Sequence, residues 1–114
     1  MPYLMIQTNQ PVGRTAGKAL MAKASARIAE LLGKPERYVM VGLHADVPML
    51  FGGSDAPAVY MELKSIGLPA DRTGELSAAL AELAQQDLAV GRDRVYVEFA
   101  DAERHMWGWN GGTF

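Results

Sequence analysis

The residue whose chemistry depends most on processing is Pro2, which follows the first methionine in the opening MPYLMIQT. If Met1 is removed, Pro2 carries a free secondary amine; if Met1 stays, the same nitrogen is an amide without basicity. A free α-amine has a pKa of roughly 7.7 to 8.0, and burial beside apolar groups such as Leu4 lowers it, because desolvation disfavours the charged form. Such an amine could act as a general base near pH 7. Alternatively, the proline only starts a strand.

Three further side chains offer binding or proton-transfer chemistry. Lys34 follows the first predicted helix, where the helix dipole favours a cation by roughly 0.3 to 1 kcal/mol. Alternatively, its ammonium group pairs with a carboxylate on a bound anion. Tyr96 and Glu98 are two residues apart in the last predicted strand, so they share one face of the sheet. That face either lines a pocket, to which they supply a phenol and a carboxyl group, or is solvated.

Other kinds of site have little support. The chain has no cysteine, which excludes disulfides, thiolate nucleophiles and cysteine-based metal sites. His44 and His105 form neither an HxxxH nor an HExxH pattern, so we expect no metal. No GxSxG nucleophile elbow is present. The glycine-rich segment FGGSDAP lacks both GxGxxG and a P-loop lysine, and therefore predicts a turn and no phosphate site.

Length and charge limit the partners. A chain of 114 residues is the size of one domain, so we expect residues 1–114 to share a single core. The 11 Lys and Arg nearly balance the 13 Asp and Glu without a basic run, which argues against a nucleic-acid or polybasic membrane surface. No apolar stretch approaches the roughly 20 residues that span a bilayer, and no signal-peptide pattern is visible. A cytoplasmic protein is expected, with unconventional secretion left open.

The elements that would position these residues follow from hydrophobic periodicity. Alternating or apolar runs predict strands, and apolar positions at steps of three and four predict helices. The predicted strands are 2–8, 38–46, 59–66 and 90–99, and the predicted helices are about 14–32 and 72–88. Gly33 and Pro35 stop the first helix. The tail HMWGWNGGTF, rich in glycine and aromatics, predicts a packed but irregular C-terminus.

The two halves of the chain repeat the order strand, helix, strand. Right-handed βαβ crossovers make the two strands of each half parallel, and joining the halves predicts an α/β (α+β) fold. Its four-stranded sheet carries both helices on one face. The other face, with apolar residues at alternate positions, would be uncovered and costly in water. Because closed rings of identical subunits can turn such faces inward, we expect a homo-oligomer.

Taken together, these segments resemble the macrophage migration inhibitory factor (MIF) family of the tautomerase superfamily. The similarity runs nearly end to end, through MPYLMIQTNQP, LLGKPERYV, FGGSDAP, the SIG of 65–67, DRVYVEF and GWNGGTF. The resemblance implies the MIF-like fold and homotrimers whose sheets line a barrel, with a pocket at each subunit boundary. It also implies an isomerase that catalyses keto–enol tautomerisation of phenylpyruvate-like α-keto acids without a cofactor.

The resemblance also implies roles for individual residues. Pro2 would be the proton-transferring base once Met1 is removed. Lys34 would pair with the substrate carboxylate, and the backbone N–H of Ile66 would help to hold it. These roles agree with the chemistry, because moving a proton between carbon and oxygen needs a near-neutral base, an anion clamp and a stabilised enolate oxygen.

The resemblance implies four further pocket residues. Tyr96 would be contributed by the neighbouring subunit, and Tyr38 and Phe114 would line the aromatic end of the pocket. Glu98 stands where the mammalian members carry asparagine, which places a carboxyl group close to an anionic substrate. It could change substrate preference, pair with Lys34 or be protonated in the pocket.

Two alternatives to a phenylpyruvate-type tautomerase stay open. One is a non-enzymatic, cytokine-like binding protein with a vestigial pocket and a protein receptor. The other is a different reaction of the superfamily, such as decarboxylation or hydration of an unsaturated acid, with Glu98 helping to activate water. Thiol redox activity is excluded, since Ala58 and Met61 stand where the cytokine members carry the cysteines of a CxxC motif.

Overall fold

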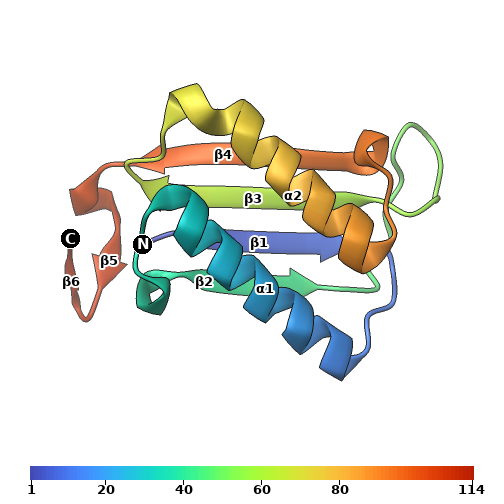
Figure 1. The fold of residues 1–114 in the computed structure, drawn as a ribbon, viewed down its shortest axis with the longest axis horizontal. Helices are drawn as coiled ribbons and strands as arrows, with labels where there is room; N and C mark the ends of the chain where they lie inside the picture. The colour runs from blue at the N-terminus through green and yellow to red at the C-terminus, as the bar shows by residue number, and fades with distance from the viewer.

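The computed structural model describes residues 1–114 and contains one four-stranded sheet, two long helices and a small C-terminal hairpin (Figure 1). The strands of the sheet are β1 (Tyr3–Thr8), β2 (Met40–His44), β3 (Val59–Ile66) and β4 (Val95–Ala102). The helices are α1 (Arg14–Leu32) and α2 (Thr73–Leu88), and the hairpin strands are β5 (Gly108–Trp109) and β6 (Gly112–Thr113). Short 3₁₀ turns are η1 (Glu36–Tyr38), η2 (Ala70–Arg72), η3 (Arg92–Arg94) and η4 (Arg104–Met106).

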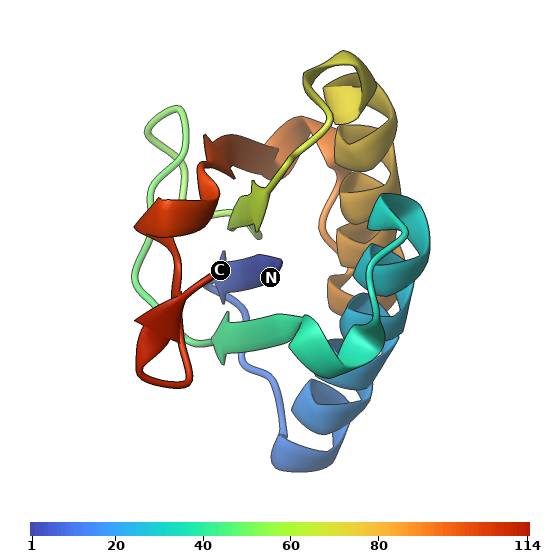
Figure 2. The ribbon, with the colours of Figure 1, turned by 90° about the vertical axis from the view of Figure 1, so that its left-hand side faces the viewer.

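The strand order is β2-β1-β3-β4, and each half of the chain forms one parallel pair. The two halves join through the antiparallel pair of β1 and β3 at the centre of the sheet. Both helices pack on the same face, and no helix covers the opposite face (Figure 2). The predicted arrangement of two βαβ repeats with both helices on one side is therefore confirmed.

The core lies between this sheet and the helices. The buried face of α1 carries Leu20, Ala24 and Ile28, which follow the predicted helical period. On the sheet, Leu4 and Leu63 are partners across β1 and β3, and both are fully buried. Burying one such side chain contributes about 1.5–3 kcal/mol. This packing fixes the sheet against the helices and thereby holds the first residues of β1 in place.

The end of α1 places Lys34. Gly33 adopts a left-handed conformation with a φ of 62°, which glycine tolerates without a Cβ clash. The N–H of Lys34 then donates to the carbonyl of Ala29 at 3.0 Å, so the chain turns sharply after the helix. The side chain of Lys34 reaches the end of β3, which pairs with the start of β1, and donates a hydrogen bond to the Ile66 carbonyl.

The C-terminal tail differs from the predicted irregular segment, because β5 and β6 form a hairpin. Its turn places Asn110 at a φ of 53° and Gly111 at 78°, the positive values that an Asn-Gly turn adopts readily. The hairpin brings the C-terminus close to the N-terminus at one end of the sheet (Figure 1).

The predicted start of the last strand is also wrong. The sequence pattern predicts a start at residue 90, but β4 begins at Val95 because residues 92–94 form η3. The N–H of Arg94 donates to the carbonyl of Gly91 at 2.9 Å, which closes a turn before the strand. The strand correspondingly extends to Ala102.

The uncovered face is less apolar than the alternation suggested. Met5, Glu62 and Glu98 are register partners across its middle, so two carboxyl groups occupy the centre of the face. Lys64 forms an ion pair with Glu62 at 3.4 Å. Large apolar side chains are exposed near the edges, among them Met40 at 66%. The expectation of an apolar face is therefore wrong for its centre.

No helix of the molecule combines the length and the apolar character needed to cross a membrane.

Candidate active site

A cavity of about 210 Å³ opens where β1 begins, between the first residues, η1 and the C-terminal hairpin. Its lining is largely aromatic or aliphatic and contains no acidic side chain. The lining residues are Met1, Pro2, Tyr3, Arg37, Tyr38, Val39, Met40, Trp107, Gly108, Trp109 and Phe114. Such a mostly apolar cavity with few polar groups is typical of small-molecule sites.

Pro2 lies in the wall of this cavity. Its side chain is less than 2% exposed, and its carbonyl accepts a hydrogen bond of 2.9 Å from the N–H of Met40. That bond begins the pairing of β1 with β2 and fixes the position of the proline. With Met1 attached, the Pro2 nitrogen is an amide, and Met1 itself is part of the cavity wall.

The amino group at this end of the chain lies in an environment that disfavours its charge. The pKa of the Met1 amine is lowered from its ordinary value, first by burial and second by the positive charge of Lys34. Both causes act at the mouth of the cavity. An amine placed here is therefore neutral over a wider pH range than a free terminus in water.

Lys34 and Ile66 contact each other, although neither lines the cavity. The Lys34 ammonium group donates a hydrogen bond of 3.2 Å to the backbone carbonyl of Ile66, the last residue of β3. The contact uses the carbonyl of Ile66, whereas the resemblance concerned its N–H. Lys34 forms no ion pair with a carboxylate of this chain. Its charge remains available to a bound anion.

Tyr38 and Phe114 both reach the cavity and form an aromatic wall with Trp109. Tyr38 meets the two other rings edge-on, with centroid distances of 5.7 Å to Trp109 and 6.1 Å to Phe114. Trp109 and Phe114 are stacked at 5.5 Å. These contacts depend on the hairpin, because the N–H of Phe114 donates to the carbonyl of Trp107 at 3.2 Å.

Sequence reasoning missed several residues of this cavity, among them Arg37, Trp107 and Trp109. The two tryptophans could have been found from the aromatic tail together with its Asn-Gly turn, which folds the tail back. Arg37 carries no such signal, although it directly precedes Tyr38. Its guanidinium carbon lies 4.8 Å above the centre of the Tyr38 ring.

Tyr96 and Glu98 are not near Pro2 within one chain. They lie on β4, where Tyr96 is the register partner of Tyr60 and packs on the Phe51 ring at 4.6 Å. Tyr96 thus lies at the opposite end of the sheet from the start of β1, and Glu98 lies at the middle of the sheet. Glu98 does not contact Lys34; its Oε2 instead accepts a hydrogen bond of 2.6 Å from the Tyr60 hydroxyl.

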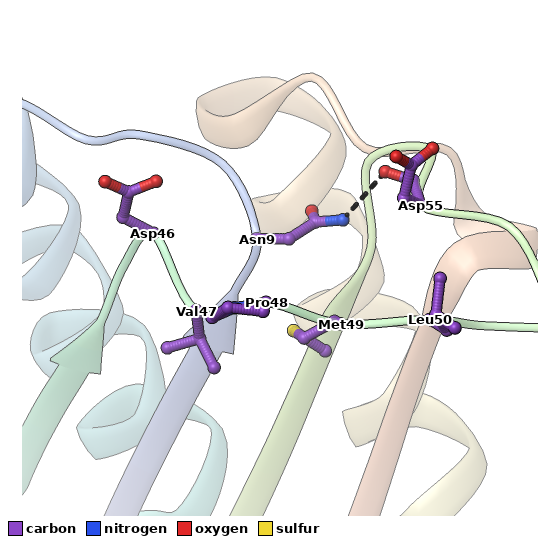
Figure 3. Close-up of a pocket in the computed structure, with 7 residues that line it drawn as sticks. All are labelled: Asn9, Asp46, Val47, Pro48, Met49, Leu50 and Asp55. Carbon is purple, nitrogen blue, oxygen red and sulfur yellow. Dashed lines mark hydrogen bonds between the residues drawn. The ribbon is translucent and has the colours of Figure 1, made fainter.

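A second, larger hollow of about 470 Å³ lies at the far end of β1 (Figure 3). It contains Asn9 and the carboxyl groups of Asp46 and Asp55. The Asn9 side chain is occupied in holding the loop, since its amide nitrogen donates to the carbonyls of Asp55 and Ala56. No residue expected in the site lines this hollow, and nowhere do three His, Cys, Asp or Glu side chains gather into a possible metal site.

The chain is similar in sequence and in fold to known proteins. The family model "Macrophage migration inhibitory factor (MIF)" matches residues 1–114. A macrophage migration inhibitory factor homolog from Brugia malayi is 38% identical over 115 positions, covering 100% of this chain and 99% of the relative. The crystal structure of a homologue from Prochlorococcus marinus shares 43% identity with a TM-score of 0.93, covering 98% of each chain. The structure of the Trichinella spiralis protein shares 32% identity with a TM-score of 0.90, covering 98% of this chain and 99% of that one. The chain therefore belongs to the macrophage migration inhibitory factor family.

Proposed function

We propose that this protein is a keto–enol tautomerase for phenylpyruvate-like α-keto acids, with the Pro2 amine as general base after removal of Met1. The observation that carries this proposal is the position of Pro2, buried in the wall of an aromatic cavity close to the cation of Lys34. Membership of the MIF family, whose resemblance implied this chemistry from the sequence, supports the same conclusion.

The proposed reaction needs no co-reactant. The neutral Pro2 nitrogen takes a proton from the carbon next to the keto group, and the C–H electron pair forms the new C=C bond. The carbonyl π electrons move to oxygen, which then receives a proton to give the enol. The reverse sequence returns the keto acid. Burial and the charge of Lys34 lower the pKa of the Met1 amine, and the same environment would favour the neutral form of a Pro2 amine, which this step requires.

Binding would extend from Lys34 and Ile66, which lie outside the cavity lining, into the aromatic cavity beside Pro2. The substrate carboxylate would pair with Lys34, and the N–H of Ile66 would provide a further hydrogen bond. The substrate ring would pack against Tyr38 and Phe114, where stacking and edge contacts suit an aromatic group. This orientation would place the carbon that loses its proton beside Pro2.

A homotrimer would complete the site. Within one chain, Tyr96 lies on the uncovered face, far from Pro2, and is 63% exposed. An exposed aromatic residue at an uncovered sheet is suited to a subunit contact. We therefore propose that the sheets of three subunits face inward and that Tyr96 and Glu98 reach the pocket of a neighbour.

The proposal is tested with protein whose Pro2 terminus has been verified by intact mass. Phenylpyruvate ketonisation should be catalysed, and Pro2→Gly should reduce kcat/KM by about 10²- to 10⁴-fold, the typical contribution of a positioned base. Equal activity of the Pro2→Gly variant would contradict the role of Pro2. Absence of turnover in the parent protein would instead favour a binding protein of the same fold.

A further inference from the structure

The cavity is lined by one cationic side chain, Arg37, which the proposed tautomerase chemistry does not use; Lys34 does not line the cavity but is close enough to the Met1 amine to lower its pKa. Lys34 and Arg37 lie three residues apart, on the connection that leads from α1 into β2. Arg37 lines the cavity directly, and no Asp or Glu side chain of the same chain lines it. A phenylpyruvate molecule has one carboxylate, which Lys34 can bind alone. The positive charge of Arg37 is therefore in excess of what such a substrate needs.

Arg37 differs from the other arginine that stacks on a ring. Arg94 lies over Phe51 at 4.9 Å, and its guanidinium group donates to several backbone carbonyls, including those of Phe51 and Ala56. Arg94 thus stabilises the loop of residues 51–57. The Arg37 guanidinium donates no hydrogen bond of this kind and takes part in none of the five ion pairs, not even with its neighbour Glu36.

Arg37 is an exposed residue whose guanidinium group has one contact within the chain, the face of the Tyr38 ring. Its guanidinium group lies above the Tyr38 ring, and Tyr38 is wedged edge-on against Trp109 and Phe114. A guanidinium held by stacking loses less freedom when it binds, and its planar fork matches a carboxylate in a bidentate manner. Arg37 therefore presents an unpaired guanidinium group to an anion at the aromatic end of the cavity.

We propose that the pocket selects α-keto acids that carry a second carboxylate on the group remote from the keto acid. One carboxylate would pair with Lys34, the ring would lie along Tyr38, and the second carboxylate would bind Arg37. This inference rests on the proposed function, because it specifies the substrate class of the same pocket. It requires no further chemical step, since the second carboxylate only binds.

The chain supplies a direct readout of binding. It contains two tryptophans, and both Trp107 and Trp109 line the cavity. Quenching of intrinsic fluorescence, corrected for absorption by the ligand, therefore reports occupancy whether or not the ligand turns over. The two probes are phenylpyruvate and its para-carboxylate derivative, which differ only in the second anion.

The experiment compares dissociation constants and kcat/KM of both probes for the Pro2-terminal protein, Arg37→Gln and Arg14→Gln. Arg14 is an exposed residue at the start of α1, at the opposite end of the molecule, so this control removes the same charge elsewhere. We expect the parent protein to prefer the dianion. Arg37→Gln should reduce the preference, expressed as the ratio of the two probes, by about three- to tenfold, and Arg14→Gln should not. Arg37→Lys should retain part of it, because the charge remains.

The outcomes distinguish a failure of the proposed dianion preference from a failure of the proposed tautomerase activity. A parent protein without preference, or an Arg37→Gln variant whose ratio is unchanged, would overturn the selection of a dianion even if both probes turn over. Arg37-dependent binding of the dianion without any turnover would support the ligand class and contradict the tautomerase. Binding of neither probe would overturn both proposals.

Discussion

The Tyr60 hydroxyl donates a hydrogen bond of 2.6 Å to Glu98 Oε2 and lies 3.0 Å from Glu62 Oε1. A single phenol therefore bridges two carboxyl groups at the centre of the uncovered face. Because the hydroxyl orients the Glu98 carboxylate, it would also set the direction in which Glu98 approaches a neighbouring pocket. Tyr60 is thus a positioning residue for the carboxyl group that distinguishes this chain from the mammalian pattern.

Tyr60→Phe should change the alkaline behaviour of the protein. The pKa of Tyr60 is raised by its hydrogen bond to Glu98, then by burial and by Glu62. A tyrosine in the unfolded chain ionises at about pH 10, so the associated stability is fully present below that pH and is lost as the pH rises through the folded pKa. Urea midpoints of the parent should therefore fall more steeply above about pH 10 than those of Tyr60→Phe. Parallel curves would show that the bridge does not form.

Lys34→Gln should move the ascending limb of the kcat/KM profile of the Pro2-terminal protein to higher pH. Burial and the charge of Lys34 both lower the pKa of the Met1 amine, and we expect the same charge to act on the Pro2 amine, so removing it should raise the pKa of that amine and delay formation of the neutral base. The control is Lys18→Gln, an exposed lysine on α1. A limb that moves equally in both variants, or in neither, would argue against coupling between Lys34 and the amine.

Each of the two helices is followed by a residue in the left-handed conformation, but the residue types differ. Gly33 follows α1 with a φ of 62°, and Ala89 follows α2 with a φ of 55°. A Cβ in the left-handed region is strained, so Ala89→Gly should stabilise the protein by about 0.5–1 kcal/mol after the greater freedom of glycine in the unfolded chain is included. Gly33→Ala should destabilise it by about 1 kcal/mol. Urea unfolding measures both; changes of the same sign would contradict this account.

Arg94→Ala should loosen the loop that ends at Pro57. The guanidinium group holds four of its carbonyls, with the shortest bond, 2.7 Å, to Phe51. We expect a loss of about 2 kcal/mol in unfolding free energy and faster amide exchange in the loop. Because Phe51 packs on Tyr96, kcat/KM should fall as well. Arg92→Ala, a change at an exposed neighbour, serves as the control and should leave exchange unaffected.

The regular elements were predictable because their signals are local. The spacing of Leu20, Ala24 and Ile28 repeats along one helical face, and Gly33 ends that face, so the predicted 14–32 agrees with α1. The strand 59–66 alternates between buried and less buried positions up to Lys64, as its sequence indicates. In both cases, neighbouring residues in the chain determine the structure.

Other features depend on contacts between distant segments. The partnership of Tyr60 with Glu98 joins two strands and needs their register, which the sequence does not state. Arg37 enters the site only because the tail folds back and fixes Tyr38. The hairpin did have a local signal, because Asn110-Gly111 is typical of a hairpin turn. The other glycines of the tail instead favoured the prediction of an irregular segment.

The central claim, that the Pro2 amine is the base, is tested most directly by one preparation in which only part of the chains has lost Met1. Turnover of phenylpyruvate is measured before and after treatment with a methionine aminopeptidase, and intact mass gives the fraction of Pro2-terminal chains at each point. The account predicts that turnover rises in proportion to that fraction and extrapolates to zero for the Met1-retaining form. Turnover that is independent of the fraction would contradict it.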